Sequence, residues 1–309
     1  MIKTAWVLVL AIVAAFPASL EAQWTRAYGG KNDDDATSIQ PAPEGGFIMV
    51  GTSGYMDRWG GWVPQIWVVR LNVSGAILWQ KRMHAELGCD QSYGACVQTT
   101  RDDRFVLTGR VYARSLSGMG NLSAVKLDAN GDPDWQTYVT EPGYPDERRW
   151  SGGHSIQQTW DGGYIATGLH VYEQWDPVLA KASFSRHDLL IYKTDSQGKR
   201  KCGGTFGGDG EERGHSILET PDGGFLVAGV TDSFGAGADD ALVLKLGKTG
   251  NIDTSCGLFV RNSKAEIREG AGRAEWKAGE GGCGYIPWSI KPLLPWLFTS
   301  AANTVICKK

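Results

Sequence analysis

Aromatic side chains that could stack on sugar rings gather in segments that we expect to form long loops. The chain has 13 tryptophans among 309 residues, and a tryptophan exposed on a rigid scaffold offers a broad apolar face to a ligand. The alternative is that these rings pack over the loop bases and the rim of the core. The candidate ligand-binding residues are Tyr55, Arg58, Trp59, Trp62, Trp150 and Trp175.

Two clusters of carboxylates could bind calcium, or act as acid and base in glycoside cleavage. The alternative is that they are solvated loop residues. Only one other repeat carries a comparable pair, Asp146 and Glu147, so a site in every repeat is not supported. We expect no cofactor, with Ca²⁺ as the one ion that these carboxylates leave open. The candidate metal ligands are Asp33, Asp34, Asp35, Asp209, Glu211 and Glu212.

Two other motifs suggest chemistry, and we interpret both as structural. The run from Asp128 to Asp134 resembles a calcium loop, but its twelfth position holds Val139 in place of the bidentate glutamate. His154 and His215 each precede a serine, but neighbouring strand residues point to opposite faces of a sheet. No G-x-S-x-G elbow is present.

The N-terminus and the cysteines predict an exported protein. Residues 1–22 have a lysine followed by an unbroken apolar stretch, which is typical of a secretory signal cleaved after Ala22. We therefore expect a secreted, periplasmic or cell-surface location. Six cysteines allow up to three disulfides. Our guess pairs Cys89 with Cys96, Cys202 with Cys256, and Cys283 with Cys307.

Charge and hydropathy exclude two classes of partner. The net charge is −3, and no run of lysine and arginine stands out, so we expect no nucleic acid. The most apolar later stretch, 286–301, contains three prolines and a lysine, so we expect no membrane span.

The elements that must position these residues come from an internal repeat. Segments 37–52, 95–110, 154–169 and 215–230 align on the aromatic residues Phe47, Phe105, Tyr164 and Phe225, which are separated by 58, 59 and 61 residues. A second block follows each copy, with turn glycines Gly75, Gly131, Gly198 and Gly250 in register. Trp79 and Trp135 stand four residues after their glycine, and Cys202 takes this place in the third copy.

Each repeat predicts four strands. Paired glycines mark tight hairpin turns, which accounts for many of the 42 glycines. Four strands repeating at about 58 residues predict an all-β chain: a β-propeller, or a propeller-like array of four four-stranded antiparallel repeats. The alternative is a β-sandwich of repeated hairpins. We expect a signal at 1–22, the repeat domain at 23–260, and an atypical tail, partial blade or cap at 261–309. Trp24 resembles a fourth-strand tryptophan, so the N-terminal strand could close the ring.

The pattern W-x4-GG, SI-x6-GG-[FY]-x3-G and D-x4-K-L-x3-G-x3-W resembles the secreted propeller-type repeats of bacteria and archaea. It is also similar to the Delta-60 repeat, to which the Ile252-Asp253-Thr254 piece corresponds. The resemblance covers roughly residues 24–258. It implies an extracellular or cell-surface protein and transfers no catalytic residue. Asp103 and Arg104 replace the paired glycines in the second repeat, so we expect a different turn there.

Tight turns and long loops should lie at opposite ends of an antiparallel meander, and binding residues usually sit on the loops. We therefore favour a non-enzymatic binding or scaffold protein whose ligand face is formed by the long loops. The partner would be a glycan or a surface protein. The rival is a carbohydrate-active hydrolase or lyase that uses loop carboxylates. A third hypothesis is an adhesion fragment that needs other chains to complete its ring.

Overall fold

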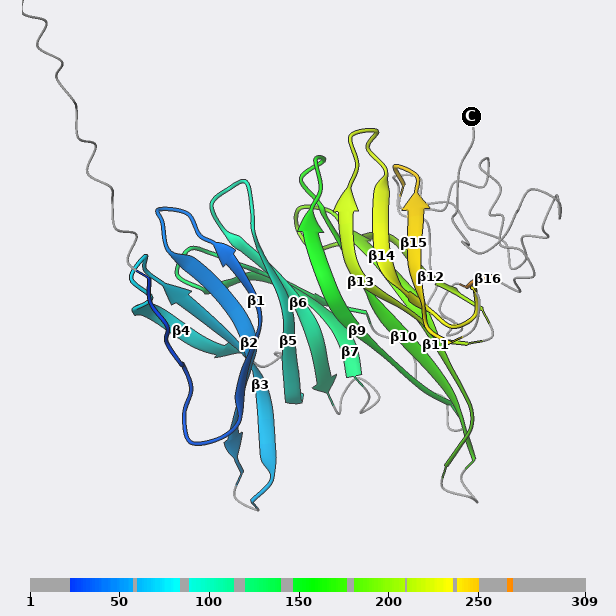
Figure 1. Ribbon diagram of the computed structural model, residues 1–309, viewed down its shortest axis with the longest axis horizontal. Helices are drawn as coiled ribbons and strands as arrows, with labels where there is room; N and C mark the ends of the chain where they lie inside the picture. Colours follow the sequence, from blue (N-terminus) through cyan, green and yellow to red (C-terminus); the bar gives the residue numbers. More distant parts are fainter. Residues whose placement is uncertain are drawn as a thin grey trace, which may run out of the picture.

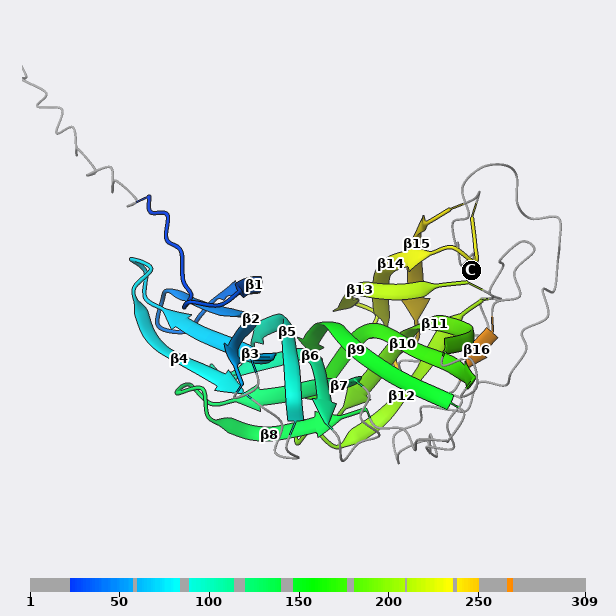
Figure 2. The ribbon, with the colours of Figure 1, turned by 90° about the horizontal axis from the view of Figure 1, so that it is seen from below.

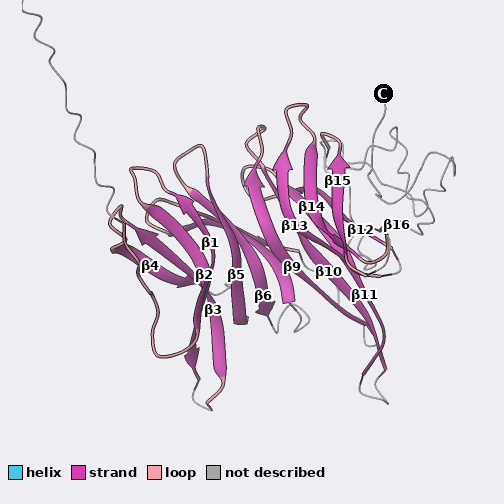
Figure 3. Cartoon of the chain, in the orientation of Figure 1, coloured by secondary structure: helices cyan, strands magenta, loops and turns pink. Residues whose placement is uncertain are grey.

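The computed structural model describes residues 23–57, 60–83, 89–113, 120–139, 147–176, 181–208, 210–235, 238–249 and 266–268. All regular structure in these ranges is β-strand (Figure 3). The described residues contain no helix long and apolar enough to cross a membrane.

Four sheets follow one another along the chain, each a meander of antiparallel strands in sequence order. The first sheet comprises β1 (Asp34–Pro41), β2 (Phe47–Met56), β3 (Trp62–Leu71) and β4 (Ile77–Met83). The second comprises β5 (Cys89–Thr99), β6 (Phe105–Ala113), β7 (Gly120–Leu127) and β8 (Pro133–Tyr138). The third comprises β9 (Glu147–Gln158), β10 (Tyr164–Asp176), β11 (Lys181–Thr194) and β12 (Arg200–Gly207), with the short β16 (Glu266–Arg268) beside β12. The fourth comprises β13 (Glu212–Glu219), β14 (Phe225–Thr231) and β15 (Asp240–Leu246).

This order confirms the predicted propeller-like array of antiparallel repeats. Three sheets contain the four expected strands, and the fourth contains three within the described residues. The sheets stand side by side in an open arc, with the first and the fourth at its two ends (Figure 2). Closure of the ring by the N-terminal strand is not observed, because residues 23–33 form no strand.

The tight turns lie together at one end of the sheets (top of Figure 1), and the β2–β3 and β10–β11 hairpins extend to the other end. In the third sheet, the Asp161 carboxylate accepts a hydrogen bond from the Gly163 N–H, and Lys193 Nζ lies 2.5 Å from it. The corresponding lysine–aspartate pairs are Lys126–Asp102 at 2.5 Å and Lys245–Asp222 at 3.0 Å. Each pair ties a first turn to the third strand of its own sheet.

The expectation of a different turn in the second repeat is wrong. The Thr100 N–H donates to the Arg104 carbonyl at 2.8 Å, as the Thr159 N–H donates to Gly163 at 2.9 Å. Asp103 takes the left-handed conformation, with φ of 57°, where Gly162 has φ of 84°. Aspartate tolerates this region better than most residues, so the turn survives the loss of its glycine.

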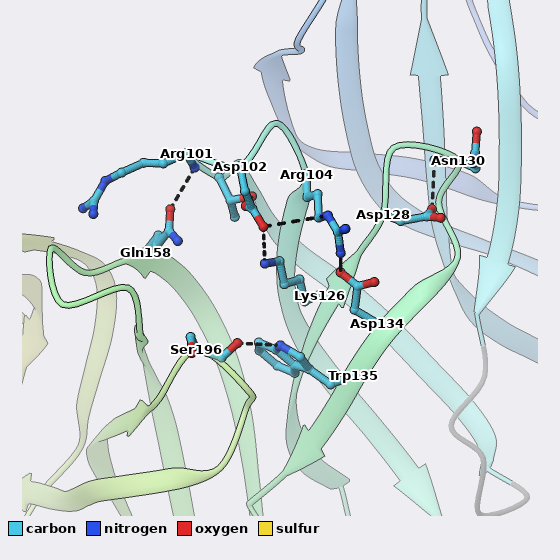
Figure 4. Close-up of polar contacts among 11 residues, drawn as sticks. Arg101, Asp102, Arg104, Lys126, Asp128, Asn130, Asp134, Trp135, Gln158 and Ser196 are labelled. Atoms are coloured by element: carbon cyan, nitrogen blue, oxygen red, sulfur yellow. Dashed lines mark hydrogen bonds and ion pairs between the residues drawn. The ribbon is translucent and has the colours of Figure 1, made fainter.

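In each of the first two sheets, a tryptophan on the fourth strand contacts the following sheet, at the turn between its third and fourth strands. Trp79 Nε1–H donates to the Ala129 carbonyl at 3.2 Å. Trp135 Nε1–H donates to the Ser196 carbonyl at 3.1 Å (Figure 4). Both rings lie over the turn glycine, and a Cβ added there would meet the ring at 2.6 Å. We call this contact the tryptophan lock.

Trp24 forms the same lock on the first sheet. Its Nε1–H donates to the Val73 carbonyl at 3.2 Å, and its ring lies over Gly75. It also makes an edge contact with Phe47, as Trp79 does with Phe105. The predicted likeness of Trp24 to a fourth-strand tryptophan is therefore confirmed, although no fourth strand surrounds it within the described residues.

Apolar side chains fill the junctions between neighbouring sheets. Val68 of the first sheet packs with Val97 and Leu107 of the second. Ile156 and Tyr164 of the third sheet pack with Leu122 of the second. Burial of these side chains is the main favourable term in holding the sheets together.

The guess that Cys89 bonds Cys96 is wrong. Cys96 is a free, buried thiol. The two cysteines lie on the same strand, β5, and seven residues of extended chain span about 23 Å. Disulfide geometry needs Cα atoms within about 7 Å of each other. Cys202 is disulfide-bonded, but Cys256, Cys283 and Cys307 lie outside the described residues, so the partner of Cys202 and the Cys283–Cys307 pairing stay predictions.

Removing a lock should destabilise the chain. We expect Trp135→Ala to lower the free energy of unfolding by roughly 2–4 kcal/mol, because a large ring is lost from a junction. Trp135→Phe should cost less, since it removes the indole hydrogen bond, worth about 1 kcal/mol, and part of the ring. Denaturant unfolding measures both. Trp160→Ala is the control, because this ring is exposed. A cost for Trp135→Ala no larger than that of the control would contradict the lock.

Thiol chemistry should separate the cysteines. We expect Cys96 to react with a thiol reagent only after unfolding, because its side chain is buried. Peptide mapping without reduction should recover Cys202 linked to Cys256. A peptide linking Cys89 to Cys96 would contradict the strand assignment.

Candidate functional site

Arg110 forms the centre of a cluster at the long-loop end of the sheets. It lies on β6, and its guanidinium lies over three aromatic rings: Tyr93 at 5.3 Å, Tyr112 at 5.0 Å and Trp150 at 5.1 Å from the ring centroids. Tyr93 is its antiparallel partner on β5, and Trp150 comes from β9 of the next sheet. A guanidinium over aromatic faces is held by the ring quadrupoles.

Two glycines make room for the Arg110 side chain. A Cβ at Gly120 would meet Arg110 Cδ at 2.8 Å, and a Cβ at Gly152 would lie 3.6 Å from the same atom. Gly120 lies opposite Tyr112 in the β6–β7 pair. The arginine stem therefore lies against backbone, which limits its freedom and directs the guanidinium towards the rings.

The cluster continues into the first sheet on one side and, on the other, to a histidine of the third sheet that pairs with Glu211. Trp62 of β3 makes an edge contact with Tyr93, with ring centroids 6.5 Å apart. On the other side, Trp150 contacts the His187 ring at 6.4 Å. His187 Nδ1 lies 3.0 Å from Glu211 Oε1, and Glu211 also pairs with Arg213. We call Trp62, Tyr93, Arg110, Tyr112, Trp150 and His187 the Arg110 cluster.

The electrostatics of this region favour an anion. Within the described residues no hydrogen bond or ion pair joins the Arg110 guanidinium to a protein group. Burial lowers the pKa of nearby His154, and the positive charges of His215, Arg110 and Arg213 lower it further, against the hydrogen bond to Gly214. Burial and the neighbouring Tyr112 raise the pKa of Tyr93, against the effect of Arg110. Arg110 thus keeps its N–H donors for a ligand, in surroundings that disfavour another cation.

The structure joins two of the residues predicted to bind a ligand and leaves the others apart. Trp62 and Trp150 come from different sheets and meet through Tyr93 and Arg110. Tyr55 is exposed on the β2–β3 hairpin and makes no ring contact with the cluster among the described residues. Arg58 and Trp59 lie outside the described residues, and so does the side chain of Trp175.

Sequence reasoning missed Tyr93, Arg110, Tyr112 and His187. These residues stand within strands, where the repeat predicts structural positions. One signal was available: Arg110 follows Gly109 at the end of the second-repeat motif, where the other repeats have Thr52, Leu169 and Val230.

The candidate metal ligands take structural hydrogen bonds instead of converging. Asp34 accepts from the Gly30 N–H at 2.6 Å and Asp35 from the Thr52 N–H at 2.7 Å. Glu212 is fully buried and accepts from the Gly208 N–H at 2.7 Å. Asp33 is exposed, Glu211 pairs as described above, and Asp209 lies outside the described residues. Among described residues no group of three histidines, cysteines or carboxylates could hold a metal; a calcium site stays a prediction.

His154 serves the junction between the third and fourth sheets. It occupies a bulge in β9, and its Nδ1 lies 2.9 Å from the Gly214 carbonyl oxygen, to which a protonated Nδ1 donates. His215 occupies the matching bulge in β13 and contacts the His154 ring edge at 5.8 Å. A bulge turns one side chain out of the regular alternation, and here it directs a side chain towards the neighbouring sheet.

The run from Asp128 to Asp134 forms the expected hairpin turn. Asp128 Oδ1 accepts from the backbone N–H groups of Asn130 and Asp132, each at 2.8 Å. Asp134 pairs with Arg104 at 2.5 Å (Figure 4). The carboxylates of Asp128 and Asp134 are therefore engaged by protein groups, as expected for a structural turn.

No protein-family model and no curated protein matches the sequence. Solved structures similar to this chain include a protein of unknown function from Dyadobacter fermentans, 11% identical with a TM-score of 0.45 over 80% of this chain and 67% of that one. A thermostable family-43 glycoside hydrolase is 13% identical with a TM-score of 0.38, covering 82% of this chain and 80% of that one. A levansucrase mutant from B. megaterium is 9% identical with a TM-score of 0.34, covering 75% and 74%. The propeller-like architecture rests on the strand order and the repeated junctions, and the likeness to Delta-60 repeats stays a prediction.

The half-buried His154 should make stability depend on pH. Its pKa in the folded chain is below the value of about 6.5 of an unfolded histidine. The contribution of neutral His154 to the free energy of unfolding is therefore fully present above that unfolded value. It is lost as the pH falls towards the folded pKa, because the unfolded chain binds the proton first.

We expect the free energy of unfolding to fall as the pH drops below about 6.5, by about 1.4 kcal/mol for each unit of pKa depression. His154→Asn, which keeps an N–H donor, should flatten this dependence, and the exposed His215→Asn should retain most of it. Denaturant titrations at several pH values measure the effect. An unchanged slope in His154→Asn would contradict it.

Proposed function

We propose that the chain is an exported, non-enzymatic binding protein that recognises an acidic saccharide at the Arg110 cluster. The observation that carries this proposal is a guanidinium held over three rings, with no protein anion beside it among the described residues. A carboxylate or sulfate on a sugar would complete it, since arginine binds such groups with two parallel hydrogen bonds.

The aromatic residues provide the second half of the recognition. Trp62 is exposed at the edge of the cluster, so part of its ring is available to the apolar face of a sugar. Tyr93 joins this ring to Arg110. An acidic sugar unit at Arg110 with a neighbouring unit on Trp62 uses both groups. This arrangement supports the predicted glycan partner and adds an acidic group to it.

The geometry gives the rival hydrolase less support. Glycoside cleavage generally uses two carboxyl groups about 5–10 Å apart. Among the described residues that contact the cluster, the one carboxylate is Glu211, and it is engaged by His187 and Arg213. Binding without cleavage therefore fits the described residues better.

The test measures binding of polysaccharides that carry uronate or sulfate groups, with neutral chains of similar length beside them. We expect acidic chains to bind, and Arg110→Gln to weaken their binding about tenfold or more, because a charge-assisted hydrogen bond contributes about 1.5–3 kcal/mol. Binding should also weaken as salt is added. Trp62→Ala should weaken the binding of acidic and of neutral polysaccharides by similar factors.

Arg101→Gln is the matched control, because Arg101 is an exposed arginine on the β5–β6 turn at the opposite end of the sheet. It should leave binding unchanged. Absence of binding to every chain would overturn the proposal. Equal loss in both arginine variants would assign the binding to overall charge instead of the cluster.

A further inference from the structure

We infer that the chain completes a ring with a second copy of itself, in which each N-terminal segment forms the fourth strand of the other chain's fourth sheet. The N-terminal segment is residues 23–30. The inference does not depend on the proposed function, because it rests on the junctions between sheets.

The N-terminal segment has the sequence and contacts of a fourth strand without a sheet of its own. Its sequence QWTRAYGG aligns with KCGGTFGG, residues 201–208, which covers most of β12 and the glycine after it. In both places the last glycine N–H donates to a carboxylate four residues later, Asp34 at 2.6 Å and Glu212 at 2.7 Å. Trp24 forms the lock on the first sheet that Trp79 forms on the second. The segment therefore occupies the place of the last strand of a preceding sheet.

In the part of the chain that the structure describes, the fourth sheet ends at β15, and this edge fits the N-terminal segment. Within the described residues β15 pairs with β14 alone. In the complete sheets the lock position lies opposite the basic residue of the third strand: Trp79 opposite Arg70 and Trp135 opposite Lys126. The same register places Trp24 of a second chain opposite Lys245. The sequence of this chain puts Thr254 where the first two repeats have their tryptophan.

Two apolar residues mark the unmatched faces. Ile39 of β1 is 52% exposed, although Val97, Ile156 and Ile217 at the same repeat position are buried. Val243 of β15 is also 52% exposed, although Val68, Ala124 and Ile191 at its position are buried. In the complete junctions, the residue at the repeat position of Ile39 packs against the preceding sheet. The residue at the repeat position of Val243 packs against the following sheet. The first and fourth sheets thus carry the two halves of one missing junction.

A second copy is the occupant that both halves fit. The two halves lie at opposite ends of an open arc, so they do not meet within one chain (Figure 2). Propellers usually have about four to eight blades. Two chains of four sheets give eight, and three chains would exceed that range. Joining the fourth sheet of each chain to the first sheet of the other gives a closed twofold ring with two identical junctions.

The first experiment measures the mass of the exported chain by light scattering during size exclusion. We expect twice the mass of one chain, and Val243→Arg should give a single chain, because it places a charge in the new junction. Leu78→Arg is the matched control: Leu78 is exposed on β4, and its repeat equivalents are Asp134 and Lys201. It should remain a dimer. Unfolding of both variants is measured, to show that each chain is folded.

The second experiment identifies the strand. The register places Arg26 of one chain opposite Val243 of the other, as Gly204 lies opposite Ile191. Arg26→Cys and Val243→Cys are made in separate chains with different tags, mixed, unfolded, refolded together and oxidised. We expect a cross-linked product that carries both tags. Lys248→Cys replaces Val243→Cys in the control, and it should give little product.

Three results would overturn the inference. A wild-type chain that runs as a single copy at every concentration would show that its own residues cover β15 or that the edge stays free. A dimer that survives Val243→Arg would place the interface elsewhere. A cross-link formed only when both cysteines are in one chain would show closure within a single copy.

Discussion

The contact between a tryptophan of one sheet and a glycine turn of the next is the interaction on which this architecture depends. Neighbouring sheets meet through side chains, and apolar packing is non-directional. The indole N–H supplies direction, because it donates to one carbonyl of the facing turn, Val73, Ala129 or Ser196. The turn glycine has two constraints at once. Its φ is near +80°, and the ring lies where a Cβ would stand.

The third junction differs from the first two at the lock position. Cys202 stands in place of the tryptophan, and its Sγ lies 2.9 Å from the Thr249 carbonyl oxygen. Hydrogen bonds also join the first strands of the two sheets here. His154 Nδ1 lies 2.9 Å from the Gly214 carbonyl oxygen, and the Gln157 side chain accepts from the Glu219 N–H at 2.9 Å. The first junction has a similar bond, from the Val97 N–H to the Ser38 hydroxyl at 3.3 Å, so such bonds accompany the locks.

Much of the fold was predictable because hairpin turns and strand alternation are local properties. The paired glycines and the spacing of the tryptophans place the strands and turns before any contact is known. Local rules also explain two failures. Asp103 adopts the glycine conformation, which residue type alone does not reveal. Cys89 and Cys96 are near in sequence, but an extended strand separates them, so nearness along the chain misleads in a β protein.

The candidate site was less predictable because its members come from three sheets. Trp62, Arg110 and Trp150 are brought together by two junctions, and no local pattern reports which faces meet there. The expected long loops gave Trp62 and Trp150 as candidates, and both lie in the cluster, on β3 and β9; their contact with a ligand stays a prediction. The same expectation could not identify Arg110, whose significance comes from what surrounds it: three rings, two glycines and no protein anion among the described residues.

The position of the site follows from the division of labour between the two ends of the sheets. The tight-turn end holds the locks, which join neighbouring sheets, and the lysine–aspartate pairs, which brace each sheet from within. At the long-loop end the Arg110 cluster bridges the first three sheets. Its ring-to-guanidinium geometry therefore depends on locks at the far end, because a change in the angle between two sheets moves Trp150 relative to Arg110. The tryptophans in register thus hold neighbouring sheets together, and our proposal gives Trp62 and Trp150, which are out of register, to a ligand.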